Sequence, residues 1–269
     1  MIVLSPNLVL TKPTKEFSAD NPVIGWRNVV TTQNLSSTTA DVDKPLVNLA
    51  NPSTYLKWAG TSVVDEEFLT VQMQTEDDVD YLAIVGHNFG TARIGIELQV
   101  AEEEGVFTTV LSLMPSDDRV LIFRFAPKSY HSVRLKLQPG NAAPTAAVLY
   151  VGKLLVLQRK IQVSFTPINM GRSSEVTTAM SERGQFLGRH VTAKWLENFA
   201  NFAFMTPEWY REEMDPFIEA SLTTPFFFAW APISYPRETG YVWVTEQPRP
   251  EIHDPTGFIR VNLQMQGVA

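Results

Sequence analysis

"DYLAIVGHNF", residues 80–89, is the stretch that decides the fold. It begins as a compact apolar run and ends in Gly86, His87 and Asn88, which are residues that favour turns. A short apolar run bounded by turn residues is typical of a β-strand that is buried on both of its faces. The sequence therefore predicts an inner strand here.

The segments around this strand also have the pattern of strands. "FLTVQMQT" (68–75) and "RIGIELQVA" (93–101) alternate between apolar and polar side chains, as half-buried strands do. Further strands are predicted at 107–114, 119–126, 131–138 and 146–157. Short strands separated by Gly, Pro, Asp and Asn predict an antiparallel β-sandwich or jelly roll over residues 1–157.

The pattern changes after residue 157. The segment 206–222 has helix signals, because Thr206 can cap and Pro207 occupies the first helical position. Pro216 predicts a kink, or a second short helix capped by Asp215, because proline removes a helical hydrogen bond. Strands are predicted at 160–168, at 175–199 as two strands around a Gly184 turn, and at 225–230, 240–247 and 258–267.

The predicted fold class is therefore mainly β. A jelly-roll sandwich (1–157) precedes an α+β domain (158–269) that has an antiparallel sheet and one kinked helix. We expect the two parts to be separable folding units.

Composition excludes several classes of protein. The net charge of −7 over 269 residues argues against nucleic-acid binding, which needs a basic surface. The absence of cysteine excludes disulfides, thiolate zinc sites and thiol nucleophiles. No apolar stretch has the length of a signal peptide core or a membrane span, so we expect a soluble protein without membrane insertion.

Local motifs for chemistry are weak. "EIHDP" (251–255) brings together Glu251, His253 and Asp254, but Pro250 and Pro255 flank it and favour a loop over a metal site. The acidic stretches 41–44 and 76–80 lack the spacing of a calcium loop. No nucleophile elbow is present. We expect no catalytic residues, no metal and no cofactor, and hence no enzyme.

Three segments of the first part carry a family resemblance. "NPVIGWRNVV" (21–30), "VNLANPSTYLKWAG" (47–60) and "VDYLAIVGHNFG" (79–90) resemble the galactose-binding-like, discoidin-type jelly roll of bacteriophage tail proteins. The matching positions are Asn48, Leu49, Ala50, Tyr55, Leu56, Trp58, Asp80, Tyr81, Ala83, Gly86, His87 and Asn88. The resemblance implies that Trp58 closes the sandwich core rather than stacking on a sugar.

The second part resembles the C-terminal region of phage tail-tip and baseplate proteins, through residues 184–208 and "PFFFAWAP" (225–232). In the better-known distal tail proteins the ring-forming domain comes first, whereas here the order is reversed. The resemblance implies a structural virion protein of a long-tailed bacteriophage, made in the host cytoplasm and sited in the tail tip or baseplate. It would form a ring of six or three copies and link the tail tube to tip or fibre proteins.

Two sets of residues are predicted to form the ring interface. The first is aromatic: Phe226, Phe227, Phe228 and Trp230. The second is Phe258, Arg260 and Asn262, on one face of a terminal strand that we expect at a sheet edge. The alternative is that the aromatic residues form the chain's own core, that the strand is internal, and that the protein is a monomer that joins a ring built by other proteins.

The alternative function is a carbohydrate-binding module that attaches the particle to host surface glycans. Such sites use an exposed aromatic face together with a few polar groups from the loops of the sandwich. The candidates are His87, Asn88 and Arg93.

Overall fold

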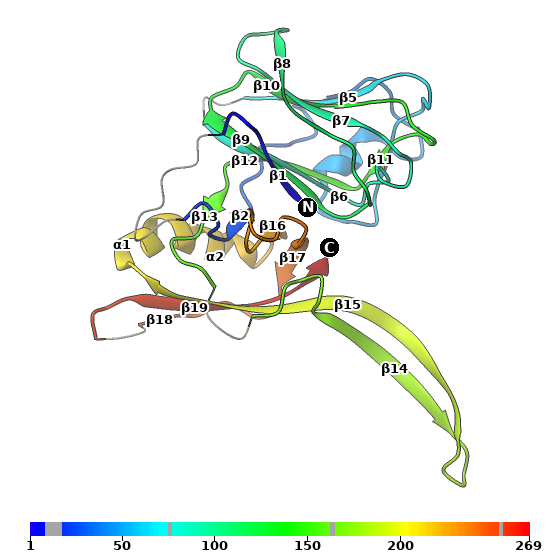
Figure 1. Cartoon of the computed structure of the whole chain (residues 1–269), viewed down its shortest axis with the longest axis vertical. Helices are drawn as coiled ribbons and strands as arrows, with labels where there is room; N and C mark the ends of the chain where they lie inside the picture. Colours follow the sequence, from blue (N-terminus) through cyan, green and yellow to red (C-terminus); the bar gives the residue numbers. More distant parts are fainter. Residues whose placement is uncertain (9–17, 75–76, 162–164, 253–254) are drawn as a thin grey trace.

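The computed structural model describes residues 1–8, 18–74, 77–161, 165–252 and 255–269. Its elements form stacked layers (Figure 1): two sheets of a sandwich, a third sheet beneath them, and a helix on that third sheet. The fold is mainly β with antiparallel sheets and one helix, as the sequence predicts.

The sandwich is of the jelly-roll type. Its outer sheet has the order β3 (Leu35–Ser37), β5 (Glu67–Gln72), β10 (Ser132–Leu137), β7 (Ile96–Ala101), β8 (Phe107–Leu113). Its inner sheet has the order β1 (Ile2–Leu4), β9 (Leu121–Lys128), β6 (Val79–Val85), β12 (Val148–Gly152). A two-stranded ribbon, β4 (Trp58–Ala59) with β11 (Thr145–Ala146), and a 3-10 helix (Leu46–Ala50) complete it.

The third sheet has eight strands. Their order is β13 (Leu155–Val156), β2 (Val23–Gly25), β16 (Phe226–Ala229), β17 (Thr239–Val244), β19 (Ile259–Val268), β15 (Phe186–Met205), β14 (Arg172–Met180), and β18 (Pro250–Ile252) also pairs with β19. Because β19 lies between other strands, the prediction that the terminal strand forms a sheet edge is wrong.

Strand β6 confirms the expectation of an inner strand, because all seven of its residues are buried. Since successive side chains of a strand point to opposite faces, Leu82 and Ile84 enter the sandwich core. Tyr81 and Ala83 enter a second core, which also contains Phe227 of β16. The inner sheet is thus covered on both sides.

This second core crosses the predicted boundary at residues 157 and 158. It joins residues of the inner sheet to Phe227, Ala229 and Tyr241 of the third sheet. Two strands from the first 157 residues, β2 and β13, are themselves members of the third sheet, where β2 pairs with β16. The two parts therefore share strands as well as a core.

The helix covers the far face of the third sheet. It runs as α1 (Pro207–Trp209), a π-helical turn (Tyr210–Met214) and α2 (Asp215–Ser221). A second short helix is present near Pro216, as expected, but Asp215 is its first residue and does not cap it. The two helices are joined by the π turn, in which the Asp215 N–H donates to the Tyr210 carbonyl. Thr206 does not cap with its side chain, contrary to expectation. Its hydroxyl accepts instead from the Gln158 amide, at 3.3 Å.

Among the described residues, no helix has the length and hydropathy of a membrane span.

Candidate functional site

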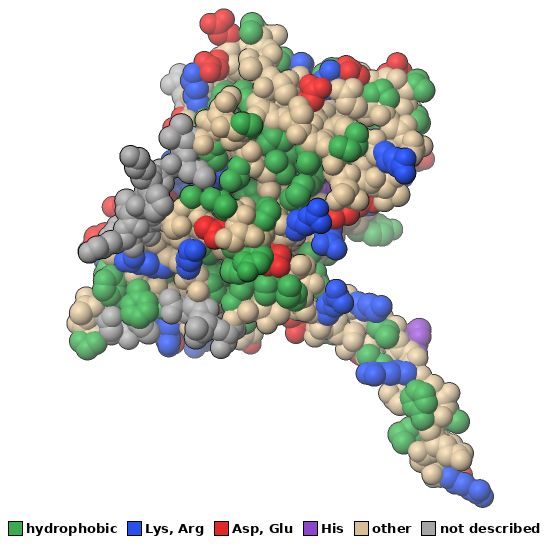
Figure 2. Space-filling view, in the orientation of Figure 1, with side chains coloured by type: hydrophobic (Ala, Val, Ile, Leu, Met, Phe, Trp, Pro, Cys, Tyr) green, Lys and Arg blue, Asp and Glu red, His purple; other side chains and the backbone are tan. Residues whose placement is uncertain are grey.

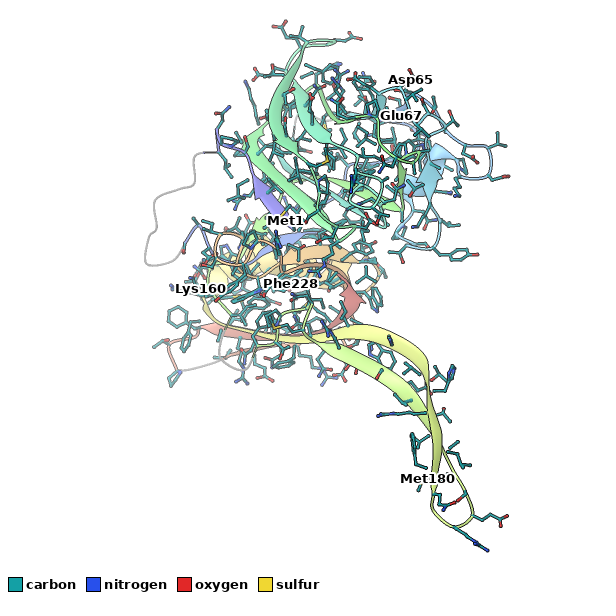
Figure 3. The ribbon with its side chains drawn as sticks, turned by 45° about the vertical axis from the view of Figure 1, so that its right-hand side comes forward. Met1, Asp65, Glu67, Lys160, Met180 and Phe228 are labelled. Carbon is teal, nitrogen blue, oxygen red and sulfur yellow. The ribbon has the colours of Figure 1, made fainter. Side chains whose placement is uncertain are left out.

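The third sheet extends into a long two-stranded projection, which we call the β-arm (residues 172–195). Strand β15 pairs with β19 only from Leu196 onward, so its first ten residues pair with β14 alone. The two strands leave the body together (Figure 1), and Met180 lies near the far end (Figure 3). Gly184 makes the turn with φ +76, in the left-handed region that favours glycine.

Apolar side chains are exposed at the end of the β-arm. The exposed fractions of Met180, Phe186 and Leu187 are 61%, 67% and 66%. A two-stranded hairpin without a packed face is marginally stable in water. Both outer edges of the arm also present unpaired backbone groups, among the described strands. The arm therefore combines exposed apolar side chains with unpaired strand edges.

The charge of the β-arm is opposite to that of the rest of the chain. Residues 172–195 carry four basic and two acidic side chains, whereas the remainder carries 18 Lys and Arg against 27 Asp and Glu. On the face shown in Figure 2, basic and apolar side chains dominate the arm. The arm and the rest of the chain therefore carry net charges of opposite sign.

The predicted glycan-binding residues lie at the end of β6. His87 is 3% exposed and stacks on Phe89 with ring centroids 4.6 Å apart. Its Nε2 is 2.7 Å from the Arg119 carbonyl, and its Nδ1 accepts from the Phe89 N–H at 3.3 Å. Burial lowers the pKa of His87 to about 4, so the ring is neutral at neutral pH. These contacts give His87 a structural role.

Asn88 and Arg93 follow in the same loop. The Asn88 side chain donates to the Ala143 carbonyl at 2.8 Å and accepts from the Thr145 N–H at 2.9 Å, so it fastens the loop to the strand opposite. Arg93 is exposed and has φ 53, a left-handed conformation. Of the three, His87 is buried, Asn88 is half-buried and Arg93 is exposed, and glycan binding by this loop stays a prediction.

The aromatic run of β16 is internal. Phe226 and Phe228 are buried against the helix, and Phe227 is buried against the inner sheet of the sandwich. None of the three is more than 1% exposed, so their rings are not available to a partner in this conformation. The alternative stated for them, intramolecular core, is what the structure shows.

The other predicted interface residues are half-buried. The Trp230 indole donates to Glu238 at 2.6 Å and stacks on Tyr235. Phe258 contacts Phe204, with ring centroids 6.4 Å apart.

Arg260 and Asn262 lie on the face of β19 opposite its buried Val261 and Leu263, as the alternation predicts. Arg260 pairs with Glu251. A hollow of about 570 Å³ lies over this face, lined by Phe199, Glu246, Gln247, Arg249, Glu251, Asn262 and Gln264. Arg260 and Asn262 remain candidates for an interface.

No cluster of three or more His, Asp or Glu side chains suited to a metal ion occurs in the described part of the chain. His253 and Asp254 of the "EIHDP" stretch, and Glu76, lie outside the described residues.

No family model and no curated protein matches this sequence. Among solved structures, chitosan-binding module 1 from a chitosanase/glucanase of Paenibacillus sp. IK-5 is similar, with 15% identity, a TM-score of 0.42, and coverage of 46% of this chain and 98% of that chain. The family 32 carbohydrate-binding module of C. perfringens NanJ, solved with galactose, has 19% identity, a TM-score of 0.38, and coverage of 44% and 90%. Each of these likenesses covers less than half of this chain, and none names a family for it.

Proposed function

We propose that this protein is a structural assembly protein, whose copies join one another through the β-arm. The carrying observation is the arm itself, a hairpin with exposed Met180, Phe186 and Leu187 and no packed face of its own. Burying these side chains against a neighbour contributes on the order of 1.5–3 kcal/mol for each fully buried residue. The opposite charges of arm and body favour a neighbour of the same kind.

The particle proposed for this assembly is the tail tip or baseplate of a long-tailed bacteriophage, as a ring of six or three copies. The support is the resemblance of residues 184–208 and 225–232 to such proteins, together with the arm. A head-to-tail contact between copies closes into a ring when its rotation closes, and otherwise continues as a filament.

The test is removal of the distal arm. Residues 177–190 are replaced by Asn-Gly, which forms a two-residue hairpin turn between Val176 and Val191, a directly paired position. The full chain is expected to form closed oligomers in sedimentation velocity and electron microscopy, and the shortened chain is expected to remain a folded monomer. A full chain that stays monomeric at high concentration overturns self-assembly through the arm.

Glycan binding by the sandwich is the second candidate, and one observation on this chain favours it. The loop 51–57 presents Tyr55 with 89% of its surface exposed, next to half-exposed Leu56. An exposed aromatic face is the usual platform for a sugar ring, because the apolar face of the sugar packs on it.

A glycan array with the full chain tests this candidate. Binding that is lost in Tyr55→Ala and kept in Arg93→Ala assigns the loop 51–57, and the reverse assigns the loop after β6. Absence of binding above background removes the candidate and leaves the sandwich as scaffold.

A further inference from the structure

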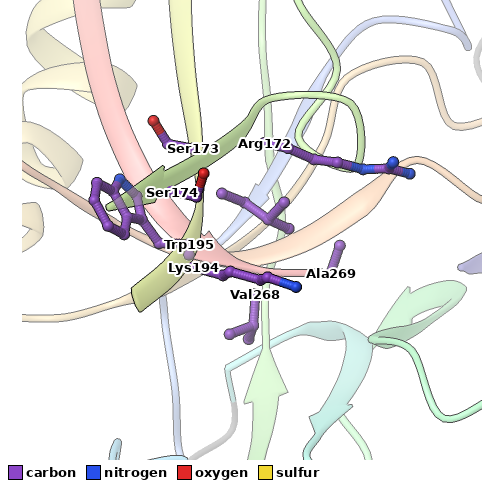
Figure 4. Close-up of a pocket in the computed structure, with 9 residues that line it drawn as sticks. Arg172, Ser173, Ser174, Lys194, Trp195, Val268 and Ala269 are labelled. Atoms are coloured by element: carbon purple, nitrogen blue, oxygen red, sulfur yellow. The ribbon is translucent and has the colours of Figure 1, made fainter. Parts of the chain in front are cut away.

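A pocket lies at the base of the β-arm, where three strands run side by side. Arg172 of β14, Leu196 of β15 and Gly267 of β19 are paired in register across it. The pocket has a volume of about 540 Å³ and is lined by Arg172, Ser173, Ser174, Lys194, Trp195, Leu196, Gly267, Val268 and Ala269 (Figure 4). We call it the arm-base pocket.

The rim of the arm-base pocket is cationic. Arg172 and Lys194 extend to the same side of the pocket in Figure 4, and both are exposed. Neither has a carboxylate partner within ion-pair distance among the described residues. The carboxylate of Glu197 accepts instead from the Trp195 indole and, at 3.2 Å, from the Gln266 amide. The two cations are therefore free to meet carboxylates of a partner.

The floor of the same pocket is apolar. Leu196 and Ala269 pack against the core between the helix and the third sheet. A pocket with an apolar floor and two cations on its rim fits a segment that carries both acidic and apolar side chains. A small inorganic anion would leave the floor uncovered.

This chain displays such a segment at the turn between β7 and β8. The stretch "EEEGV" (102–106), which we call the acidic tip, has three consecutive glutamates. Glu102 pairs with Lys128, but Glu103 and Glu104 are exposed and make no ion pair with any described residue. Val106 follows with 61% of its surface exposed. The acidic tip thus offers two carboxylates and one apolar side chain.

The tip and the pocket lie far apart on the body of the molecule, the tip on the sandwich and the pocket on the third sheet at the base of the β-arm. Strands β7 and β8 project from the top of the sandwich in Figure 1, whereas the β-arm leaves the third sheet at the bottom. Acidic side chains gather at the upper end in Figure 2. This separation prevents the tip from filling the pocket of its own chain but suits a neighbour.

We propose that the arm-base pocket binds the acidic tip of a second copy of this chain. Glu103 and Glu104 would pair with Arg172 and Lys194, and Val106 would cover Leu196. This inference rests on the proposed self-assembly and names one of its contacts. Because two different patches meet, the contact is head-to-tail.

Charge reversal in matched pairs tests the contact. Variant one carries Arg172→Glu and Lys194→Glu, and variant two carries Glu103→Lys and Glu104→Lys. Each reversal places like charges opposite one another, so self-association of either variant alone is expected to weaken by at least about tenfold in sedimentation velocity. Raising the salt concentration should weaken the wild-type association in the same direction.

An equimolar mixture of the two variants provides the decisive result. The acidic pocket of variant one faces the basic tip of variant two, and the basic pocket of variant two faces the acidic tip of variant one. The mixture is therefore expected to recover association, in an alternating order. Two folded variants that fail to recover it when mixed overturn the pairing.

Controls separate this inference from the proposed function. Lys44→Glu with Arg211→Glu, and Glu212→Lys with Glu213→Lys, reverse exposed charges elsewhere and should leave association unchanged. If the wild-type chain associates and variants one and two associate equally well, the arm-base contact is refuted while self-assembly stands. If the wild-type chain never associates, self-assembly itself is refuted.

Discussion

The ring of Tyr150, on the inner sheet of the sandwich, meets the ring of Tyr241, on the third sheet, edge to face with centroids 6.1 Å apart. The hydroxyl of Tyr150 donates to the Pro225 carbonyl, and the hydroxyl of Tyr241 donates to the Pro52 carbonyl. Tyr150 thus donates from the sandwich to the second part of the chain, and Tyr241 donates from the second part to the sandwich. The two parts of the chain are bonded to one another through side chains that are buried in a common core.

A fragment of residues 1–157 is expected to be poorly folded on its own. It would expose the face of the inner sheet that carries Tyr81 and Tyr150, and strand β2 would lose its partner β16, so that β2 and β13 would pair only with each other. Circular dichroism on heating and light scattering measure this. A monomeric fragment that unfolds cooperatively at the temperature of the full chain would contradict it, and would support the separable units expected from the sequence.

Trp58→Ala is expected to reduce the free energy of unfolding by about 3–5 kcal/mol, the usual cost of emptying a core aromatic site. Trp58 is fully buried, which confirms its assignment to the core, and its indole donates to the Thr39 carbonyl at 3.2 Å. Denaturant unfolding gives the measurement. Tyr55→Ala, three residues away on an exposed side chain, is the matched control and should change stability by less than about 0.5 kcal/mol.

Acid should destabilise the protein through His87. Its pKa is about 4 in the folded state and 6.5 in the reference state, so between these values the unfolded chain binds more protons and stability falls as pH falls. Moving from pH 7 to pH 5 should cost about 2 kcal/mol from this group. Protonation would also remove the acceptor that Nδ1 gives to the Phe89 N–H.

Asp80 has the opposite effect on the pH dependence of stability over part of this pH range. Burial raises its pKa from 3.8 to about 6, so the folded state binds more protons between these values and gains stability as pH falls. His87→Gln isolates the histidine, because it removes one titration and leaves the other. Relative to the wild type, this variant should lose less stability between pH 7 and pH 5, and equal losses in both proteins would refute the assignment.

Gly171→Ala is expected to disturb the base of the β-arm. A Cβ at this position would lie 1.8 Å from the Glu197 carbonyl oxygen, which is backbone and cannot move aside without shifting β15. The cost expected in unfolding experiments is about 1–3 kcal/mol. Gly188→Ala is the control, since a Cβ there meets nothing within 4 Å. Similar stabilities of the two variants would show that β14 and β15 yield at this point.

The sequence predicts the features of the fold that depend on the local pattern of apolar and polar residues. The run from Val79 to Val85 shows that β6 is buried on both faces, but the cover on its second face comes from Phe227 and Tyr241, far along the chain, and no local signal names them. The position of β19 in its sheet is equally non-local. The sequence places β19 at the end of the chain, whereas the fold inserts it between β17 and β15.

The candidate sites were harder to predict, for a physical reason. His87 has the pattern of a polar side chain in a loop, yet its ring nitrogen is satisfied by the carbonyl of Arg119, which lies in another loop, just before β9. The hairpin around Gly184 is predicted, but its projection from the body is not. Apolar residues such as Phe186 and Leu187 give the same sequence pattern whether they lie in a core or on an exposed arm. The excess of basic side chains over 172–195 is the one signal in the sequence that marks the arm.

Strand β15 runs for 20 residues, from Phe186 in the arm to Met205 in the sheet. The arm is therefore a continuation of the third sheet rather than a separate loop. Its direction is set by that sheet, which shares a core with the sandwich. A neighbouring molecule that bound the arm would therefore lie at a fixed angle to the body and at a fixed distance from it. Every copy added in this way would repeat the same rotation, so the geometry of a single chain would determine the curvature of the assembly.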